Sequence, residues 1–528
     1  MKAFVVGFIA GLVVVGGVWG SPAEETASAA SQGPKYGGTL DVAIPGAPHT
    51  LDWQSTVSHP LPHIMGHVFE GLFGFTREFD AAPELADSWE ASDDGTVWTI
   101  RLRPGVKFHN GDELTAEDVV ASLERWRRVG PKGPALDELE RFEITDDHTL
   151  SMHFSSPKGR FLLLLLGSDE NKAVIMPKEV AEASPEAGTL SEVVGTGPYR
   201  FVEYREDQFV RLERFADYTA RDDAPDYQTG NKIAYPDELL FWIVPEASTR
   251  VAGLESGEYD IITGVPDAEF QRLAGADGVV PVKNGPGVLL YMMFNHQHGP
   301  TADINFRRAV QAIMDAEKVV AAAVADPEFA TVNPSFYPPE SAYNTDACAD
   351  LYNQVDADKA REYLAASDYA GEKVIIQTIS SSESHVRTGL SIAEQLQSIG
   401  INAEMVQYDV QTWVAKRRDP NELNIYTSGG YWIDPSLYHP EFNGTFPSTE
   451  VGYYHDETEE VFRGLAAETE FDARYALGEA LQCEFYNKVA TINLGYQYRL
   501  FARRDVIQDP EGYLALGNPT LHHVWIDE

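Results

Sequence analysis

Two short runs of alternating apolar and polar residues, separated by a turn, predict a β-hairpin early in the chain. Residues 89–92 and 97–102 are rich in aromatic and branched side chains, and Asp93-Asp94-Gly95 between them is a turn signal. After a second turn, residues 106–108 predict one more short strand. Thr115 then predicts a helix N-cap, because acidic residues follow it in the electropositive first turn.

A second periodic region, residues 373–407, alternates strand and helix signals. Residues 374–379 are a branched apolar run typical of a buried strand, and 401–406 are another. Between them, residues 389–399 carry apolar side chains at helical spacing and stop at Gly400. A strand, a crossover helix and a parallel strand indicate an α/β architecture.

Composition indicates a folded protein with more than one core. The chain is 43% hydrophobic and 11% aromatic, so it can bury a large core. Its length of 528 residues exceeds what one core usually supports. Its formal charge of −42 excludes nucleic acid and anionic lipid as partners, because both need a basic surface. The 82 acidic residues are scattered, which favours a hydrated acidic surface suited to a saline medium; an ordinary acidic secreted protein is the alternative.

The N-terminus has the layout of a secretory signal peptide. Residues 3–19 carry no charge and are followed by small and polar residues. We predict a signal peptide over residues 1–29, and cleavage after either Gly20 or Ala29 fits. Since no cysteine lies near the cleavage zone to carry a lipid, we expect a periplasmic protein without a lipid anchor.

The two cysteines, Cys348 and Cys483, lie far downstream of the leader. An even count in an oxidising compartment allows one disulfide. Two buried free thiols are the alternative, because cysteine is among the most buried residue types.

The segment from Pro83 to Trp126, which includes the predicted hairpin and helix cap, resembles the signature of a known family. It is similar to family 5 extracellular solute-binding proteins of ABC importers, the oligopeptide- and dipeptide-binding type. The resemblance covers roughly Tyr36 to Trp525. Further matching segments are residues 36–43, the expected opening strand, and residues 68–73, 195–201, 255–261 and 304–315, the last an expected helix.

The resemblance implies a two-domain α/β periplasmic-binding-protein fold, class II and clam-shell in type, with an additional lobe inserted in the first domain. The implied limits follow from the family pattern. Domain I comprises residues 36–77, 195–285 and 495–528, the inserted lobe 78–194, and domain II 286–494.

The same resemblance implies a monomeric binding component that captures a peptide or peptide-like solute and delivers it to an ABC permease in the inner membrane. An oligosaccharide, an opine or another non-peptide polar solute is the alternative within this class. A secreted hydrolase is the competing class, but the sequence has no nucleophile elbow, zinc-protease motif or Walker loop. We therefore expect no enzyme activity and no cofactor.

One departure from the family bears on the ligand. In peptide-binding members, an aspartate four positions before a proline takes the ligand's α-ammonium; here the position four before Pro435 is Tyr431. A phenol offers a neutral hydrogen bond or a π-face instead of an ion pair. Tyr431 and Trp432 can stack on the ligand while Asp434 takes over the charge; alternatively, Trp432 is core and Asp434 forms a turn.

Three further residues are candidate ligand contacts, each with a structural role as the alternative. Trp413 follows a strand end, where open α/β sheets place ligand contacts. Asn295 follows the strand 289–294, at the entry to domain II that resembles the family's hinge. Arg387 lies near a helix start and can meet an anionic group.

His59, His63 and His67 recur every four residues, a spacing that suits metal ligands on one helix face. Pro60 and Pro62 interrupt that register. Two imidazoles without a nearby carboxylate or cysteine make a poor site, so we expect no metal.

Overall fold

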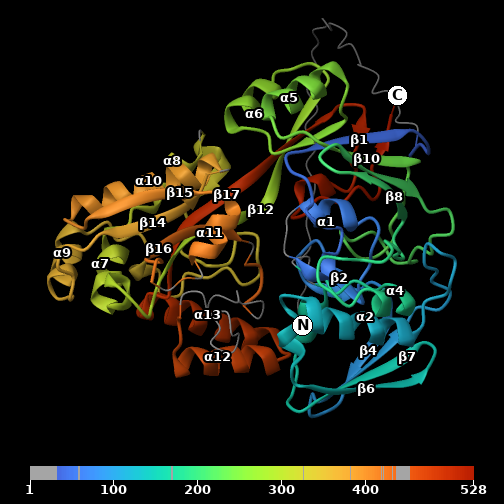
Figure 1. Cartoon of the computed structure of the whole chain (residues 1–528), viewed down its shortest axis with the longest axis horizontal. Helices are drawn as coiled ribbons and strands as arrows, with labels where there is room; N and C mark the ends of the chain where they lie inside the picture. Colours follow the sequence, from blue (N-terminus) through green and yellow to red (C-terminus); the bar gives the residue numbers. More distant parts are fainter. Residues whose placement is uncertain are drawn as a thin grey trace, which may run out of the picture.

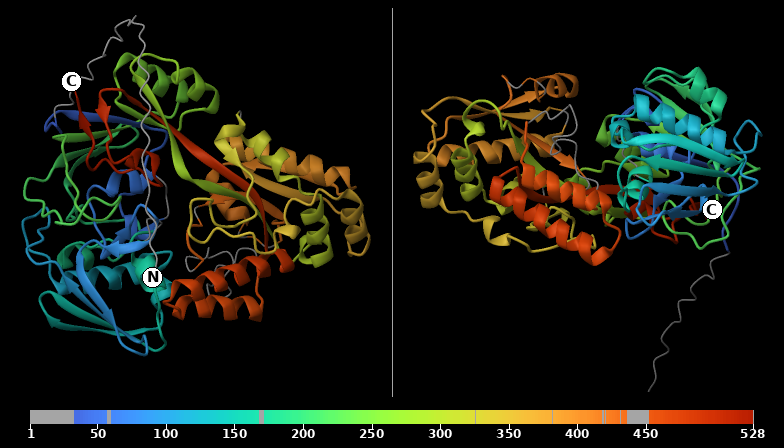
Figure 2. Two further views of the ribbon diagram at one scale, coloured as in Figure 1. Left: turned by 180° about the vertical axis from the view of Figure 1, so that it is seen from behind. Right: turned by 90° about the horizontal axis from the view of Figure 1, so that it is seen from below.

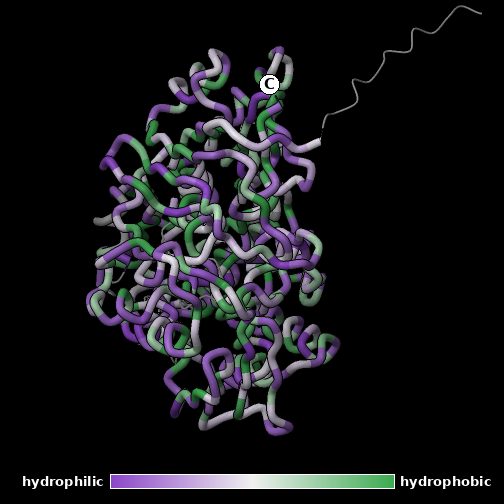
Figure 3. Tube along the Cα trace, turned by 90° about the vertical axis from the view of Figure 1, so that its right-hand side faces the viewer, coloured by the Kyte–Doolittle hydropathy of each residue, from purple (hydrophilic) through white to green (hydrophobic). Residues whose placement is uncertain are grey.

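A computed structural model of the chain describes residues 33–56, 60–167, 171–324, 326–380, 382–417, 419, 421–430, 432–435 and 452–527. The expected signal peptide, His59 and Tyr431 lie outside these residues. Within them, no helix is long and apolar enough to cross a membrane. The face in Figure 3 carries hydrophilic and hydrophobic segments intermingled along the chain.

One large mixed sheet runs through both halves of the molecule (Figure 1). We call the half with β1 and β8 to β11 the first domain and the half with β14 to β16 the second domain. The strands in spatial order are β15 (Ala403–Tyr408), β14 (Val374–Ile379), β16 (Ile425–Gly430), β12 (Val279–Phe294), β17 (Thr491–Arg504), β11 (Ile261–Thr263), β1 (Thr39–Ile44), β10 (Glu238–Ile243), β9 (Phe209–Arg214) and β8 (Tyr199–Arg205), with β13 (Ala330–Thr331) beside β17.

The antiparallel strands β12 and β17 connect the two domains. Both are long, and Figures 1 and 2 show them crossing from one half of the molecule to the other. Their register shifts between Asn284 and Val288, where residues 285–287 read Gly-Pro-Gly. The expected domain limits, 285/286 and 494/495, fall inside these two strands. A local irregularity in a two-stranded connection is a place where the backbone can bend.

The first domain is built around parallel pairing of β1 with β10 and β11. The opening strand begins at Thr39, not at Tyr36 as predicted, because Gly37 and Gly38 have φ of 113° and 83°, outside the extended range. The remaining elements of this domain are α1 (Pro60–Met65), α5 (Ala247–Ser256), α6 (Asp267–Leu273) and the hairpins β2 (Phe73–Phe75) with β3 (Ala81–Pro83) and β18 (Ile507–Gln508) with β19 (Trp525–Ile526).

A separate antiparallel sheet and its helices form a third unit, the inserted lobe, within the expected range 78–194 (Figure 1). The predicted hairpin is confirmed as β4 and β5, and Thr115 forms the predicted cap as a reciprocal capping box with Asp118. The predicted strand at 106–108 is wrong, because flanking turns leave a single bridge, Lys107 to Glu113. The elements are β4 (Ala86–Ala91), β5 (Val97–Leu102), β7 (Thr149–Phe154), β6 (Leu139–Asp146), α2 (Ala116–Val129), α3 (Phe161–Gly167) and α4 (Lys178–Ala183).

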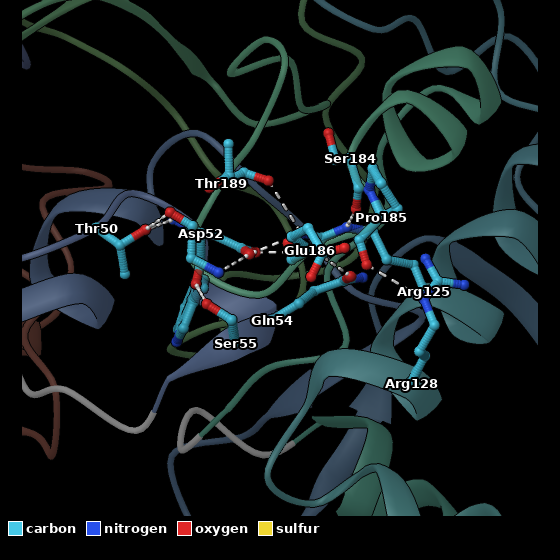
Figure 4. Close-up of polar contacts among 12 residues, drawn as sticks. Thr50, Asp52, Gln54, Ser55, Arg125, Arg128, Ser184, Pro185, Glu186 and Thr189 are labelled. Atoms are coloured by element: carbon cyan, nitrogen blue, oxygen red, sulfur yellow. Dashed lines mark hydrogen bonds and ion pairs between the residues drawn. The ribbon is translucent and has the colours of Figure 1, made fainter.

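A buried ion pair joins the inserted lobe to the first domain (Figure 4). Arg125 of α2 donates to both carboxylate oxygens of Asp52, at 2.9 and 2.7 Å, and to Gln54 Oε1 at 2.8 Å. Its Nε donates to the carbonyl of Ser184 at 2.6 Å. Arg125 and Asp52 are each 1% exposed, so their desolvation is offset by this complete set of hydrogen bonds.

The second domain contains the predicted parallel unit. β14 pairs with β15 in parallel, with Val374 opposite Ala403, and α10 connects them. The helix begins at Glu383, six residues earlier than predicted, because Ser382 caps it. The helices of this domain are α7 (Ile304–Ile313), α8 (Ala316–Ala323), α9 (Ala357–Ala365), α10 (Glu383–Ser398), α11 (Val410–Arg417), α12 (Asp456–Ala467) and α13 (Phe471–Lys488).

Cys348 and Cys483 form a disulfide, with their Cα atoms 5.3 Å apart. It fastens the loop before α9 to α13, where Gln482 also donates to the carbonyls of Thr345 and Ala347 at 3.1 and 2.8 Å. Of the two alternatives that the cysteine count left open, the structure shows the bridge.

Candidate ligand-binding cleft

A cavity of about 580 Å³ lies between the two domains, a volume typical of small-molecule sites. Three groups of residues line it. The first domain contributes Ile44, Pro45, Gly46, Pro60, His63, Thr263, Gly264, Val265 and Asp267; the second contributes Val288, Leu290, Ser382, Ser384, His385 and Gly429; and β17 contributes the five consecutive residues from Gln497 to Phe501.

The first-domain wall is formed where two parallel strands end. Ile44 is the last residue of β1, and Thr263 is the last residue of β11. Parallel strands present their carboxyl ends at the same edge of a sheet, which is where open α/β sheets bind ligands. Gly264 then turns the chain at a φ of +65°, and α6 begins at Asp267 on the cavity wall.

The strand β17 links the cavity wall to the domain connection. The hydroxyl of Tyr498 donates to Glu340 Oε1 at 3.1 Å, and Lys283 of β12 lies with its Nζ 4.6 Å from the centre of the Tyr498 ring. Burial, followed by the negative charge of Glu340, raises the pKa of Tyr498 to about 12. Tyr498 therefore stays protonated and touches both the cavity and the partner strand.

The second-domain wall includes the first turn of α10. Ser384 Oγ donates to Gln497 Oε1 at 2.7 Å, which fixes the helix start against β17. His385 is half-buried on the cavity wall, and neither of its ring nitrogens is hydrogen-bonded to another described residue. Burial lowers the pKa of His385 to about 4, so it presents a neutral imidazole to the cavity near pH 7.

Charges of both signs line the cavity despite the strongly acidic chain. Asp267 comes from the first domain, and Arg499 comes from β17. Serine hydroxyls, the Gln497 amide and the neutral His385 add uncharged hydrogen-bonding groups. Apolar side chains from both domains complete the wall. This lining suits a dipolar solute with some apolar surface.

The structure places two of the predicted ligand residues away from this cavity. Trp432 is 7% exposed and packs in an aromatic cluster, with ring centroids 5.4 Å from Tyr291 and 5.6 Å from Phe336. Asp434 is 6% exposed and accepts from Arg474 at 2.8 and 2.9 Å. The core alternative describes the packing of Trp432, whereas the Asp434 carboxylate is held by an ion pair with Arg474 and not by the expected turn.

The other described candidates also have structural partners. The Trp413 ring packs edge-on against Tyr426 at 5.7 Å and lies 4.3 Å from the Arg417 guanidinium. Asn295 is buried, donates to the Leu423 carbonyl at 3.0 Å and accepts from two backbone N–H groups.

Arg387 forms an ion pair with Glu383 one turn earlier on α10. None of the five described candidates is among the cavity-lining residues. Tyr431 lies outside the described residues, directly after β16, whose Gly429 does line the cavity. Ligand contact by these six residues stays a prediction.

The histidine series separates in the structure. His63 lines the cavity and lies 6.2 Å from the Phe501 ring. His67 is 1% exposed, and its Nε2 accepts from the backbone N–H of Leu521 at 2.9 Å. Among the described residues, no group of three or more histidine, cysteine or acidic side chains is arranged to hold a metal ion.

The sequence analysis selected none of the cavity-lining residues as a ligand contact, and it considered His63 only as a metal ligand. Signals for some of them existed: His385 and Ser384 follow the helix cap Ser382, and Asp267 follows the end of β11 and opens α6. Gln497 and Arg499 gave no local signal, because they lie in the middle of a long strand.

Two α/β domains joined by a pair of strands, with a cavity of solute size between them that apolar, polar and charged residues line, define a solute-binding protein of the clam-shell class. Residues 80–450 match the model of the bacterial extracellular solute-binding proteins, family 5 Middle. The chain belongs to this family.

Relatives agree with this assignment. The chain is 26% identical over 374 residues to a probable peptide ABC transporter periplasmic-binding protein of Sinorhizobium fredii, covering 69% of each chain. It is 27% identical over 377 residues to the dipeptide-binding protein of Escherichia coli, covering 66% of this chain and 67% of the relative. It is therefore a substrate-binding component of an ABC transporter, of the peptide-binding type.

Solved structures show the same fold. The binding protein DppA from Helicobacter pylori, in complex with the peptide STSA, superposes with a TM-score of 0.78 at 23% identity, covering 94% of this chain and 99% of that one. AgaA from A. tumefaciens R10, in complex with agropinic acid, has a TM-score of 0.78 at 21% identity, covering 93% and 99%.

Proposed function

We propose that this protein captures a short peptide or peptide-like zwitterionic solute in the periplasm and delivers it to an inner-membrane ABC permease. The observation that carries the proposal is the interdomain cavity, whose wall has a carboxylate from the first domain and a guanidinium from β17. Opposite charges with hydrogen-bonding groups between them match a solute with an ammonium, a carboxylate and amide groups.

Binding works by population shift. A ligand that touches walls from both domains binds the closed arrangement better than the open one. The register shift in β12 near Asn284 and Val288 gives the two-stranded connection a place to bend. The closed surface is what the permease recognises, and the solute leaves chemically unchanged.

An opine or another amino-acid conjugate is the second candidate. By the family resemblance, Tyr431 stands where peptide-binding members place the carboxylate for the α-ammonium, which favours a ligand without a free primary ammonium. AgaA, which has the same fold, was solved with agropinic acid.

The experiment is a thermal-shift screen followed by calorimetry. The probes are short peptides with free termini, the same peptides N-acetylated or C-amidated, opines and oligosaccharides. A ligand at a hundred times its Kd stabilises by about 2.7 kcal/mol. We expect a free-terminus peptide or an opine to stabilise the protein; stabilisation by oligosaccharides alone contradicts the proposal.

Variants localise the binding. Arg499→Ala removes a cation from the cavity wall, whereas Arg361→Ala removes an exposed cation whose partner, Asp358, is on the same helix. We expect the first to weaken binding at least tenfold and the second to leave it unchanged. Equal affinities for the two variants place the ligand elsewhere.

A further inference from the structure

The inserted lobe touches the second domain on the side of the cleft away from β12 and β17. Figures 1 and 2 show the end of α12 reaching this lobe. The backbone N–H of Gly159, in the loop between β7 and α3, donates to the carbonyl of Ala466 in the last turn of α12 at 2.7 Å. The side chain of Ala466 packs against the core of the inserted lobe. Two parts of the chain 307 positions apart thus meet backbone to backbone.

Close approach at this contact requires glycine. A Cβ on Gly159 would lie 2.5 Å from the carbonyl oxygen of Glu468 and 2.6 Å from the carbonyl carbon of Ala467. Both atoms belong to backbone, which cannot turn aside as a flexible side chain can. Any larger residue therefore separates the two surfaces.

The Gly159 loop is held firmly by its own lobe. The N–H of Lys158 donates to the carbonyl of Gly95 at 2.8 Å, and Trp98 Nε1 donates to the carbonyl of Lys158 at 3.0 Å. Lys158 also forms an ion pair with Glu138. The loop therefore moves with the sheet of the inserted lobe.

On the opposite surface, the end of α12 is tied to the segment that follows β16. Arg474 donates to the carbonyls of Leu465 and Glu468 at 3.3 and 3.4 Å and also holds Asp434. Asp434 is five positions after Gly429, which lines the cavity. Through Arg474, the contact surface is fixed to the chain segment that leaves the cavity wall.

A second contact lies beside this tie. Ile433 is 8% exposed and packs with residues of the inserted lobe and the first domain. The other buried members of this apolar cluster are Phe75, Leu164, Tyr227 and Tyr513. An apolar side chain of the second domain is therefore buried by residues across the cleft, which favours the closed arrangement.

We infer that the inserted lobe is a latch: Gly159 docks on the end of α12, Ile433 inserts beside it, and together they hold the cleft closed. The inference rests on the proposed clam-shell function. Asp434 and Arg474 are positioning residues that carry the latch surface. The inserted lobe thereby acts on ligand affinity without touching the ligand.

The test measures closure directly by double electron–electron resonance. Spin labels go on Glu140→Cys in the inserted lobe and Glu460→Cys in α12, both exposed, while the native cysteines stay in their disulfide. Distances are recorded without ligand and with a tryptic casein digest as the peptide source. Gly159→Ala is compared with Gly275→Ala, where a Cβ would come no closer than 3.7 Å to Arg272.

We expect Gly159→Ala to reduce the ratio of short-distance to long-distance populations about fivefold or more, which corresponds to the loss of one backbone hydrogen bond, and to weaken peptide retention. Its melting temperature should match that of Gly275→Ala. Ile433→Ala should act in the same direction. Identical distance distributions for the two glycine variants would overturn the latch, as would a wild type without a short-distance population under either condition. A short-distance population that Gly159→Ala reduces, in a protein that retains no peptide, would keep the latch and reject the peptide assignment.

Discussion

The inserted lobe and the interdomain cavity differ in how readily their roles can be recognised from the sequence. The lobe carries the recognisable signature, and a polar residue of that signature has a structural role. Glu84 forms ion pairs with Lys172, at 3.1 Å, and with Lys232, and all three residues are buried. The cavity is assembled from short pieces of many segments that have no recognisable motif. The recognisable motif therefore contains residues that hold the domains together, whereas the binding site is formed by residues that belong to no recognisable motif.

The largest expected effect is a loss of stability, and it tests the structural role of the inserted lobe. Replacing Arg125 by Met leaves the Asp52 carboxylate buried without its cation, which costs about 3–5 kcal/mol. Arg127→Met, two positions along the same helix and partly exposed, is the control and should cost less than about 1 kcal/mol. Urea unfolding measures both. Equal losses would show that the Arg125 pair does not secure the lobe.

Reduction of the disulfide tests how the second domain is held. The bridge closes a loop across 135 positions, and its loss should lower the free energy of unfolding by about 2–5 kcal/mol, with a lower melting temperature. Intact-mass analysis after alkylation of the unreduced, denatured protein should show no added alkyl group. Two added groups would mean that the thiols are free.

Acid should weaken the fold through buried neutral histidines. Burial lowers the pKa of His67 to about 4, below its unfolded value, so the unfolded chain binds more protons between these values. The contribution of His67 to the free energy of unfolding is therefore complete above about pH 6.5 and is lost as pH falls toward 4. At pH 5 the loss due to His67 is about 2 kcal/mol. His67→Gln should flatten the decline between pH 7 and 5. An unchanged slope would rule out His67 as its source.

The smallest expected effect on stability comes from replacing a cavity residue, and it tests the binding role of the cavity. His385→Ala should weaken binding of the cognate solute about tenfold while leaving the melting temperature near the parent's, because its ring nitrogens have no described partner to lose. Trp432→Ala is the contrasting variant and should cost about 3–5 kcal/mol of stability, since the ring lies in a packed core. Weak binding by a fully stable Trp432→Ala would instead restore its predicted ligand contact.

Local signals explain how much of the fold was predictable. The hairpin at residues 89–102, the Thr115 cap and the strand–helix–strand unit at 374–406 each depend on neighbours within one turn or one crossover. The strand at 106–108 failed because a three-residue run between two turns has no partner to extend it.

The site was less predictable because it depends on distant partners. Asp434 looked like a ligand residue, but its charge is neutralised by Arg474, 40 positions later. Trp432 follows a strand end, where a ligand contact was expected, but its ring packs against Phe336 and Phe485, which are distant in the sequence. No local pattern shows that Asp267, His385 and Arg499 meet around one cavity.

Small-angle X-ray scattering of the free and ligand-saturated protein tests the central claim most directly. The claim is that one solute bridges both domains across the cavity and shifts the population toward the closed form. We predict a smaller radius of gyration at saturation with a retained peptide or opine, and, at a ligand concentration equal to the wild-type Kd, a smaller decrease for Arg499→Ala than for the wild type. Identical profiles for the free and saturated wild-type protein would contradict the account.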